Sequence, residues 1–546
     1  MSGPGSDGAR GISHRPPARH VPGSPGRGAQ APHDDQVAQL TDPRFPPGAY
    51  PLVVVGSGPG ALQLTYSLRR LGIEHAVVSQ DQTPGGMFRK WPIFQRMLSW
   101  TKPFADQQRG SRAYERYDWN SMLADEQEHR AIMPSVMDGT SYFPSRPEME
   151  RCLATFAERT GLQIRHGCRW ESTRVLDDKE FVLETTDGEY RTQNVVFAVG
   201  VAEPWRPSVL EVDGIQQYGD LRPVETYRDH RVFIVGKQNS GFEIASGLLP
   251  WARQIVLASP SPTQLSVATR SLVGVRARYV QPYEDWALAG GVIILDASIE
   301  GVERRGDGFT VRTKNPQEER SRIFEVDDVI AATGFTTPLR DLPKLGVATF
   351  GQSRLPAQTP FWESATVRGI FFAGTIMQGS QGLRKHGIPS NSGAVQGYRY
   401  NARVLARHLA ETRFGVRPKR PKLQPDEVVP FLLREASKGP ELWHQRSYLA
   451  RVVSIDAGEG ITDQGIQPLA YFVDDDKGVD GVAIALESNG REDPYPAVYV
   501  RLQGRVARER LLRPDPLLDF EGESYRRELS DALDPILDQA LTRTVQ

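Results

Sequence analysis

The residues best suited to binding chemistry lie in the glycine-rich segment 56–61, which reads Gly-Ser-Gly-Pro-Gly-Ala. The apolar run 52–55 leads into it and apolar residues at helical spacing follow it, so the pattern predicts a strand, a tight turn and a helix. Gly56 permits the turn, Gly58 lets the backbone approach a pyrophosphate, and Ala61 allows close packing. The segment therefore predicts a dinucleotide site, although such turns also occur in proteins that bind no nucleotide.

A second strand and a pair of glycines follow this first corner. The strand is predicted at 75–78, and in dinucleotide folds a residue at its end usually holds the ribose. Ser79 and Gln80 occupy that place. Gly85 and Gly86 mark a close approach of the backbone to a flat ligand or to another segment. The next residues, 89–103, form either a surface loop with an aromatic cluster or a wall beside an aromatic cofactor, and they include Trp91, Phe94, Trp100 and Lys102.

A second glycine-rich corner spans residues 236–241 and reads Gly-Lys-Gln-Asn-Ser-Gly. Gln238 stands where the second glycine of the pattern belongs, and its side chain is expected to crowd a pyrophosphate. The N–H groups at the helix start should remain, and Lys237 is expected to offset the crowding with its charge, so nucleotide binding would be weakened but kept. Three arginines downstream either bind a 2′-phosphate, which would favour NADPH over NADH, or solvate a loop: Arg270, Arg276 and Arg278.

Other elements must position these corners. A helix is predicted after Ser145, and a later helix from about Val395 is expected to be capped by Ser390 and Asn391, leaving N–H donors aimed at an anion or a ring edge. The basic candidates before that cap are Arg384, Lys385 and His386. Strands are predicted at 163–170, 181–185, 195–199, 231–235, 255–259, 328–332 and 369–375, and in the C-terminal part at 448–455, 469–473, 479–486 and 497–502, followed by a helix at 523–541.

Composition excludes several classes of protein. The 546 residues suggest two to four domains, and 39% hydrophobic and 24% charged residues are ordinary for a globular protein. A net charge of −1 argues against nucleic acid or an anionic membrane as partner, and no apolar run reaches the roughly 20 residues of a membrane span. Cys152 and Cys168 form no C-x-x-C pair, so no thiolate zinc site or redox dithiol is expected and a cytoplasmic location is predicted.

The predicted fold is α/β with two Rossmann-like dinucleotide-binding domains, one inserted in the other, and a C-terminal α+β appendage. The predicted domains have the following limits. A disordered leader spans 1–47, and the first nucleotide domain has two parts, 48–225 and 326–415. The inserted domain spans 226–325, and the appendage spans 420–546. Dimerisation or a lid over the active site are the roles expected for the appendage. Asp474-Asp475-Asp476 is interpreted as an acidic hairpin tip, with a metal or cation site as the alternative.

Five motifs in this order resemble the class B flavin-containing monooxygenases, a group that includes amine N-hydroxylases and Baeyer–Villiger enzymes. They are Gly-x-Gly-x-x-Ala at 56–61, Gly-Gly at 85–86, Phe-Pro-Ser-Arg-Pro at 143–147, Asn-Ser-Gly-x-Glu-Ile-Ala at 239–245 and Ala-Thr-Gly-Phe at 332–335. The resemblance covers about Pro51 to Leu409. It implies FAD on the first nucleotide domain and NADPH on the inserted one.

Position and motif together assign the candidate site residues. The predicted FAD contacts are Gly56, Gly58, Pro59, Gly60, Ala61, Ser79, Gln80, Gly86, Met87, Phe88, Trp100, Trp170, Thr333, Gly334 and Asn391. The predicted NADPH contacts are Gly236, Gln238, Asn239, Ser240, Gly241, Arg270 and Arg276. The predicted catalytic residues are Asn391 together with Thr101 and Lys102, which stand where the family has an asparagine beside the flavin edge.

The resemblance implies a function that the cofactor largely performs. NADPH would reduce FAD, the reduced flavin would form a C4a-hydroperoxide with O2, and one oxygen atom would pass to a nucleophilic heteroatom of a small molecule, first of all an amine, giving N-hydroxylation. Two alternatives remain open. One is an NADPH-dependent flavin oxidoreductase without oxygen insertion, and the other is a non-enzymatic flavoprotein whose second corner no longer binds NADPH. A homo-oligomer formed through the appendage is also expected.

Overall fold

The computed structural model of this chain describes residues 44–85, 88, 96–176, 179–269, 274–282, 291–315, 320–351, 354–456, 458–474 and 478–544. Three residues predicted to bind a cofactor, Gly86, Met87 and Arg270, lie outside these ranges. The predicted leader also lies outside them up to residue 43, as do Asp475 and Asp476.

The first corner belongs to a four-stranded parallel sheet. Its strands run in the order β20-β7-β2-β3 and span Ile370–Phe372, Val195–Phe197, Val53–Val55 and Ala76–Val78. Every residue of these strands is buried, as expected for a parallel sheet that is covered on both faces. The strands predicted here from apolar runs are confirmed.

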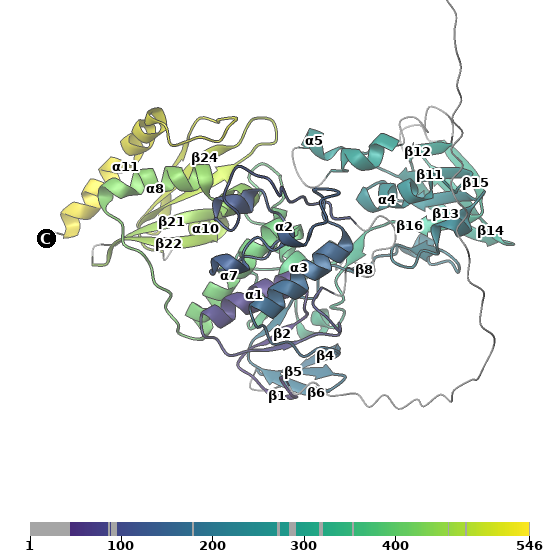
Figure 1. Ribbon diagram of the computed structural model, residues 1–546, viewed down its shortest axis with the longest axis horizontal. Coiled ribbons are helices and arrows are strands. Elements are labelled where there is room, and N and C mark those ends of the chain that lie inside the picture. Colours follow the sequence, from purple (N-terminus) through teal and green to yellow (C-terminus); the bar gives the residue numbers. More distant parts are fainter. Residues whose placement is uncertain are drawn as a thin grey trace, which may run out of the picture. The chain divides into compact units, whose positions relative to one another are not determined.

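Long helices pack around this sheet. Helix α1 (Pro59–Arg70) lies beside α7 (Val395–Arg413) in Figure 1. Helix α3 (Arg146–Arg159) begins with a capping box, in which the Ser145 hydroxyl accepts from the Glu148 N–H and the Glu148 carboxylate accepts from the Ser145 N–H. The short helix α2 (Met133–Val136) packs against α3. The helix starts predicted after Ser145 and near Val395 are confirmed, but the cap predicted for the second helix is wrong. The Ser390 hydroxyl accepts from the Ser392 N–H and caps the short turn Asn391–Gly393, whereas the N-cap of α7 is Ala394, which makes no side-chain bond.

A second, smaller sheet differs from the predicted strands. Its order is β1-β6-β5-β4, and the strands span Gly48–Ala49, Gly188–Thr192, Phe181–Thr185 and Trp170–Val175. The strand predicted at 163–170 is wrong, because β4 starts where that prediction ends. Segment 163–169 instead runs along β3, with one isolated bridge between Val78 and Arg165. Gly167, at φ +73°, interrupts the extended backbone.

The second corner has its own parallel sheet. The order is β12-β11-β10-β16-β9, and the strands span Val292–Asp296, Gln254–Ser259, Arg231–Val235, Asp328–Ala331 and Gln216–Gln217. Helix α4 (Asn239–Leu248) follows β10. Strands β9 and β16 lie just outside the predicted limits 226–325 of the inserted domain, so this sheet extends beyond those limits. Strands β7 and β20 of the first sheet come before and after it in the chain. Two parallel sheets with glycine corners confirm the predicted α/β fold.

Antiparallel and irregular elements complete these two domains. A meander, β13-β14-β15, spans Ser298–Arg305, Gly308–Lys314 and Ser321–Val326. Two short pairs join β8 (Glu203–Pro204) to β17 (Phe335–Thr336) and β18 (Thr349–Phe350) to β19 (Leu355–Pro356). Short helical turns are α5 (Ser266–Thr269), η2 (Ala113–Arg116), η3 (Gln127–His129), η4 (Ser208–Leu210), η5 (Val224–Tyr227), η6 (Leu342–Leu345), η7 (Gly374–Gly379) and η8 (Asn391–Gly393).

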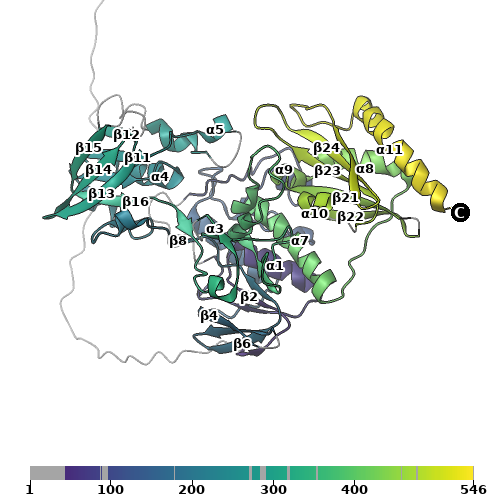
Figure 2. The ribbon, with the colours of Figure 1, turned by 180° about the vertical axis from the view of Figure 1, so that it is seen from behind.

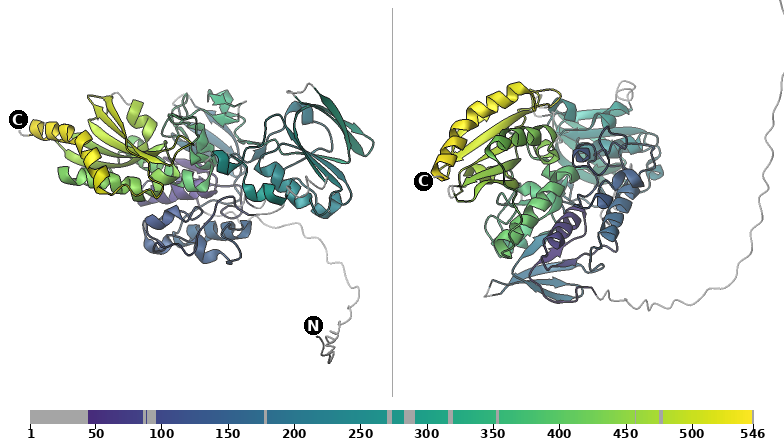
Figure 3. Two further views of the ribbon diagram at one scale, coloured as in Figure 1. Left: turned by 90° about the horizontal axis from the view of Figure 1, so that it is seen from above. Right: turned by 60° about the vertical axis from the view of Figure 1, so that its left-hand side comes forward.

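The C-terminal part is a five-stranded antiparallel sheet with helices. Its order is β22-β21-β23-β24-β25, spanning Gly460–Pro468, Leu449–Asp456, Gly481–Glu487, Tyr495–Leu502 and Arg505–Leu511. Helices α8 (Pro425–Lys438) and α11 (Glu523–Thr544) pack together beside this sheet (Figure 3). The strand predicted at 469–473 is wrong, because the structure has helix α10 (Leu469–Asp474) there. Short apolar runs do not distinguish a strand from a helix. No helix in the described ranges is long and apolar enough to span a bilayer.

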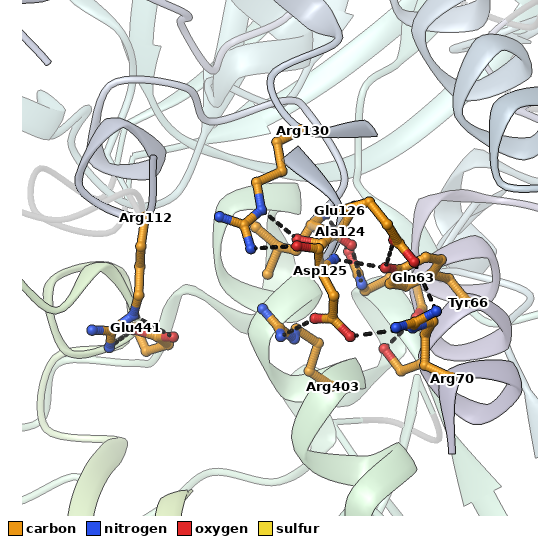
Figure 4. Close-up of polar contacts among 12 residues, drawn as sticks. Gln63, Tyr66, Arg70, Arg112, Ala124, Asp125, Glu126, Arg130, Arg403 and Glu441 are labelled. Atoms are coloured by element: carbon orange, nitrogen blue, oxygen red, sulfur yellow. Dashed lines mark hydrogen bonds and ion pairs between the residues drawn. The ribbon is translucent and has the colours of Figure 1, made fainter. Parts of the chain in front are cut away.

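A short helix joins the C-terminal part to the first domain. Helix α9 (Pro440–His444) packs against α7 and η2, and Figure 2 shows it beside α7. Figure 4 shows Arg112, just before η2, facing Glu441 of α9. The guanidinium is 2.7 Å from Glu441 and 2.7 Å from Glu435 of α8, and both carboxylates are buried. This ion-pair network fixes α9 against the first domain.

Candidate functional site

The first corner has a backbone that only glycine adopts easily. Gly56 has φ +119°, and a Cβ there would lie 2.5 Å from the carbonyl oxygen of Ala198. Gly58 precedes α1 as its N-cap and offers no side chain to cap it, so the first N–H groups of the helix remain open to a ligand. A Cβ on Gly60 would lie 2.3 Å from Gly374 Cα, so this glycine also lets η7 approach. The corner has the geometry of a pyrophosphate site.

A cavity of about 570 Å³, here called the first cavity, opens at this corner. Its size is that of a ligand or cofactor site. The N-termini of two long helices meet it and make it favourable for anionic or electron-rich groups. Helix α1 and its cap contribute Gly58, Pro59 and Gly60, and the start of α7 contributes Ala394, Val395 and Gln396. Two further predicted FAD contacts, Phe88 and Asn391, also line it.

Gln396, which the sequence analysis missed, is a buried residue of the first turn of α7. Its side chain is 1% exposed, and its Oε1 has no hydrogen-bond partner among the described residues. A buried acceptor left unpaired costs about 1–3 kcal/mol, so Oε1 is expected to accept a hydrogen bond from a bound molecule. The open helix start and this unpaired acceptor fit a flavin nucleotide. A glutamine on the buried face of a predicted helix start is the sequence signal for this residue.

A second cavity, of about 380 Å³, adjoins the first. The two cavities share the lining residues Leu98, Trp119, Arg276, Pro389, Asn391 and Gln396. Aromatic side chains form much of the wall of the second cavity. The ring centroids of Trp100 and Trp119 are 5.1 Å apart. Trp443 and His444 of α9 also line it. A small molecule bound there would therefore lie beside the ligand of the first cavity.

The C-terminal part holds Asn391 in place. The Asn391 side-chain amide donates to the carbonyl of His444, at 2.5 Å, and its backbone N–H donates to Gln445 Oε1, at 2.9 Å. The same Gln445 amide donates to Ser392 and Asn401. Asn391 lines both cavities, so residues beyond 440 position a predicted catalytic residue.

The other two predicted catalytic residues do not reach either cavity. Thr101 is fully buried, where its hydroxyl donates to Asp118 at 2.9 Å and accepts from Asn120 at 3.0 Å. Lys102 is exposed, and its Nζ lies 5.5 Å from the centre of the Tyr117 ring. The residues just before them, Met97, Leu98 and Ser99, do line the first cavity.

The remaining predicted FAD contacts lie close to the first glycine-rich corner or pack behind it. The Ser79 hydroxyl is buried and hydrogen-bonded to the Ser57 hydroxyl at 2.7 Å, whereas Gln80 is exposed. Ala61 packs in the core. The other three, which do not line either cavity, are Trp170, whose ring packs on Phe197, and Thr333 and Gly334, which hydrogen-bond to the backbone of Trp205.

The second corner repeats the backbone of the first. Gly236 has φ +121°, and a Cβ there would lie 2.3 Å from the carbonyl oxygen of Ala332. Gly241 is equally constrained, because its Cβ would lie 2.2 Å from the Gly236 oxygen. The Gln238 side chain is exposed and does not cap α4. Lys237 does not supply the free charge that was predicted, because it is buried and paired with Asp296.

Two of the three predicted arginines, Arg276 and Arg278, differ from each other in their environments. The backbone N–H of Arg276 donates to Asn239 Oδ1 at 3.0 Å, which places Arg276 beside the N-terminus of α4, where Ser240 is partly exposed. Burial, and then the charge of Arg278, lower the pKa of Arg276. Arg278 itself donates to the Met97 carbonyl at 3.0 Å and lies 4.3 Å from the Phe143 ring centre. Arg278 is thus a structural contact, and Arg276 faces both cavities.

The two cysteines are remote from this chemistry. Cys152 and Cys168 are both fully buried, and burial raises the pKa of each thiol. Neither lines the first or the second cavity. Neither cavity therefore contains a cysteine that could take part in dithiol chemistry.

Comparison with known sequences identifies relatives of the nucleotide-binding part. Residues 53–374 match the family described as pyridine nucleotide-disulphide oxidoreductase. The FAD-dependent oxidoreductase domain-containing protein 2 of Mus musculus is 25% identical over 440 residues, which are 73% of this chain and 64% of the mouse protein. The Danio rerio protein of the same name is 27% identical over 45% of this chain and 36% of its own length. The chain thus matches less than two thirds of either relative.

Solved structures share the fold. A bacillithiol disulfide reductase from Bacillus cereus superposes on 67% of this chain and 99% of its own, with TM-score 0.51 and 18% identity. An FAD-bound cadaverine monooxygenase from Erwinia amylovora superposes on 69% of this chain and 100% of its own, with TM-score 0.51 and 14% identity. With two glycine corners on two parallel sheets and a family match over more than half of its length, the chain belongs to the pyridine nucleotide-disulphide oxidoreductase family, and FAD and NADP(H) are its cofactors.

Proposed function

We propose that this protein is an FAD- and NADPH-dependent monooxygenase that transfers one oxygen atom from O2 to a nucleophilic heteroatom of a small molecule, first of all an amine nitrogen. The observation that supports this most is the second cavity, which joins the first at Asn391 and Gln396. It gives a substrate a place beside the flavin. When bound, FAD reduced by NADPH supplies the electrons that activate O2.

The chain's own groups bind and orient the cofactors. The open N-terminus of α1, after Gly58, binds the FAD pyrophosphate, and the start of α7 faces the electron-rich end of the ring system. Gln396 Oε1 accepts from an N–H group, which both a flavin ring and an amine substrate carry. Asn391, held by the C-terminal part, lies where the two ligands meet.

The second corner binds the pyridine nucleotide. The N-terminus of α4 has no side-chain cap, so its N–H groups are available to a pyrophosphate. Arg276, placed beside this terminus by Asn239, adds a charge-assisted contact to the same phosphates. Because Gln238 is exposed, it leaves this terminus accessible, which argues against a flavoprotein that has lost its nucleotide.

A second candidate function is supported by another relative of known name. A ferredoxin–NADP reductase from Lacticaseibacillus paracasei is 24% identical over 49% of this chain and 71% of its own length. An NADPH-dependent flavin oxidoreductase that inserts no oxygen is therefore the second candidate. A disulfide reductase acting through a protein dithiol has no such support, because Cys152 and Cys168 are buried away from both cavities. Homo-oligomerisation through the C-terminal part remains a prediction.

Isotope labelling separates the two candidates. The holoprotein is reduced with NADPH without oxygen, mixed with a panel of amines, sulfides and ketones under 18O-labelled O2, and the products are analysed by mass spectrometry. The proposed function predicts that one class of compound gains a single labelled oxygen. Rapid flavin reduction with hydrogen peroxide as the only oxygen product would instead support the oxidoreductase. Failure of NADPH to reduce the flavin would contradict both.

A further inference from the structure

Arg446, between α9 and β21, is a cation in the wall of the second cavity. Its Nε donates to the carbonyl of Trp443 at 3.1 Å, and its guanidinium carbon lies 4.1 Å from the centre of the Trp443 ring. These contacts fix the plane of the guanidinium. No carboxylate of the described residues forms an ion pair with it, and its two terminal nitrogens have no protein partner within the described ranges.

The rest of the cavity makes this cation unusual. Among the described residues that line the second cavity, none is Asp or Glu. The wall is instead aromatic, with Trp100, Trp119, Phe143 and Trp443. An aromatic-walled cavity with a few placed polar groups is typical of a small-molecule site. The charge of Arg446 is therefore left for a ligand to balance.

Two physical observations indicate that this arrangement is costly to maintain. Burial, and then the nearby charge of Arg116, lower the pKa of Arg446 to about 10, so the guanidinium remains protonated at neutral pH without a counter-ion. Ser447, the next residue, also lines the cavity and has φ +56°, a backbone conformation that costs a non-glycine residue about 1 kcal/mol or more. Strained and uncompensated residues of this kind cluster at functional sites.

We propose that the second cavity binds a small molecule with an aromatic or apolar body and a carboxylate group, and that Arg446 pairs with this carboxylate. The inference rests on the proposed function, since this molecule would be the substrate of that reaction. Arg446 lines the second cavity but not the first, whereas Asn391 and Gln396 line both. The carboxylate is thus held at the end remote from the flavin, and the reacting heteroatom lies near Gln396.

Binding to the oxidised holoprotein tests this without turnover. Calorimetric titrations use 3-phenylpropionate, its uncharged analogue 3-phenylpropionamide, and propionate. We expect the phenylpropionate to bind about tenfold to a hundredfold more tightly than its amide, because a charge-assisted pair is available only to the carboxylate. We expect propionate to bind more weakly than phenylpropionate, because it leaves the aromatic wall uncovered.

Arg446→Met should remove the preference for the carboxylate, and Arg446→Lys should keep part of it. The matched control is Arg116→Met, because Arg116 lies 4.7 Å from the centre of the same Trp443 ring but does not line the cavity. This control should keep the preference. Flavin content and circular dichroism establish that each variant is folded, and Arg446→Gln, which also removes the charge, replaces Arg446→Met if the latter does not fold.

Four results would overturn the inference. The parent protein binds the acid and the amide equally, or it binds neither, or Arg446→Met leaves the preference unchanged, or Arg116→Met removes it. Propionate binding as tightly as phenylpropionate would overturn the assignment of the apolar body. The proposed function fails separately. If the carboxylate preference is present but no compound gains oxygen, the monooxygenase proposal is wrong and the binding site stands.

Discussion

The two glycine corners have nearly the same backbone but different side chains. Gly56 and Gly236 have φ values of +119° and +121°, and in each case a Cβ would collide with a carbonyl oxygen of the neighbouring strand connection, at 2.5 and 2.3 Å. Each corner leads into a helix whose N-cap, Gly58 or Gln238, makes no side-chain capping bond. The first position of the motif therefore determines the turn.

The positions around the turn differ in what they leave for a ligand. After the first glycine, Ser57 hydrogen-bonds to Ser79, whereas Lys237 is buried in an ion pair with Asp296. The cap residue is Gly58 in one corner, beside a large cavity, and an exposed glutamine in the other. Both corners thus need their first glycine and a second glycine at a close contact, Gly60 or Gly241, while the two residues after the first glycine adapt the corner to its nucleotide.

The largest effect is expected at the two glycines themselves. Gly56→Ala should lower the free energy of unfolding of the first domain by about 3–5 kcal/mol, from backbone strain together with overlap, and should abolish FAD binding. Gly236→Ala should retain FAD but prevent flavin reduction by NADPH. Thermal unfolding and the flavin absorbance of the purified variants measure both.

The control for backbone strain alone is Gly72→Ala. Gly72 has φ +72°, and no atom lies within 4 Å of the position that a Cβ would take, so only the strain of about 1 kcal/mol applies. This variant should keep FAD. A Gly56→Ala protein with full FAD and an unchanged melting temperature would show that the close approach to Ala198 is not needed.

A second difference lies one helical turn into each corner, where Gln63 and Glu243 occupy the same position. Gln63 exchanges two hydrogen bonds with the Leu123 backbone, at 3.0 and 2.7 Å. Glu243 accepts from the Tyr218 hydroxyl at 3.0 Å, and burial raises the pKa of its carboxyl to about 7. The folded protein then holds a proton that the unfolded chain has lost between about pH 4.5 and pH 7, so stability falls as pH rises through this window.

Glu243→Gln should remove this pH dependence. It should be near neutral at pH 4.5 and should stabilise the protein by up to about 3 kcal/mol at pH 8, since each pKa unit corresponds to about 1.4 kcal/mol. Denaturant unfolding of both proteins across this range measures it. Gln63→Glu is the reverse substitution at the equivalent position of the first corner. It should lower the stability of the protein above about pH 5. A parallel pH profile for parent and Glu243→Gln would contradict the assignment.

The next effect concerns the charge beside the second corner. Arg276→Ala should weaken the use of NADPH and NADH alike by about tenfold to a hundredfold, because a charge-assisted contact to the pyrophosphate contributes about 1.5–3 kcal/mol. Stopped-flow flavin reduction at varied nucleotide concentration measures it. Arg253→Ala, an exposed arginine of the same domain, is the control and should have no effect. A loss confined to NADPH would place the 2′-phosphate at Arg276 instead.

The smallest effect is expected where the corners differ most in sequence. Gln238→Gly should tighten NADPH binding by only about twofold to fivefold, since the glutamine side chain is exposed and glycine is a slightly better N-cap. FAD content should not change. An improvement above tenfold would show that Gln238 does crowd the pyrophosphate, as the sequence pattern predicts.

Local patterns predicted much of the fold. The buried strands at both corners, helix α3 and most of the C-terminal strands follow from apolar runs and start signals that a short window contains. Strands β22 and β25, which have many polar or charged residues, gave no such signal, and the apolar run at 469–473 was assigned to the wrong element.

The sequence by itself determined the two corners, because a glycine at positive φ between a strand and a helix is a local requirement. Only the tertiary structure decided which side chains face the cavities. Ser99 lines the first cavity while Thr101, two residues on, is buried behind it, and Gln396 and Arg446 come from segments far apart in the chain. Cavity lining depends on the register and packing of such distant segments, and no local pattern contains that information.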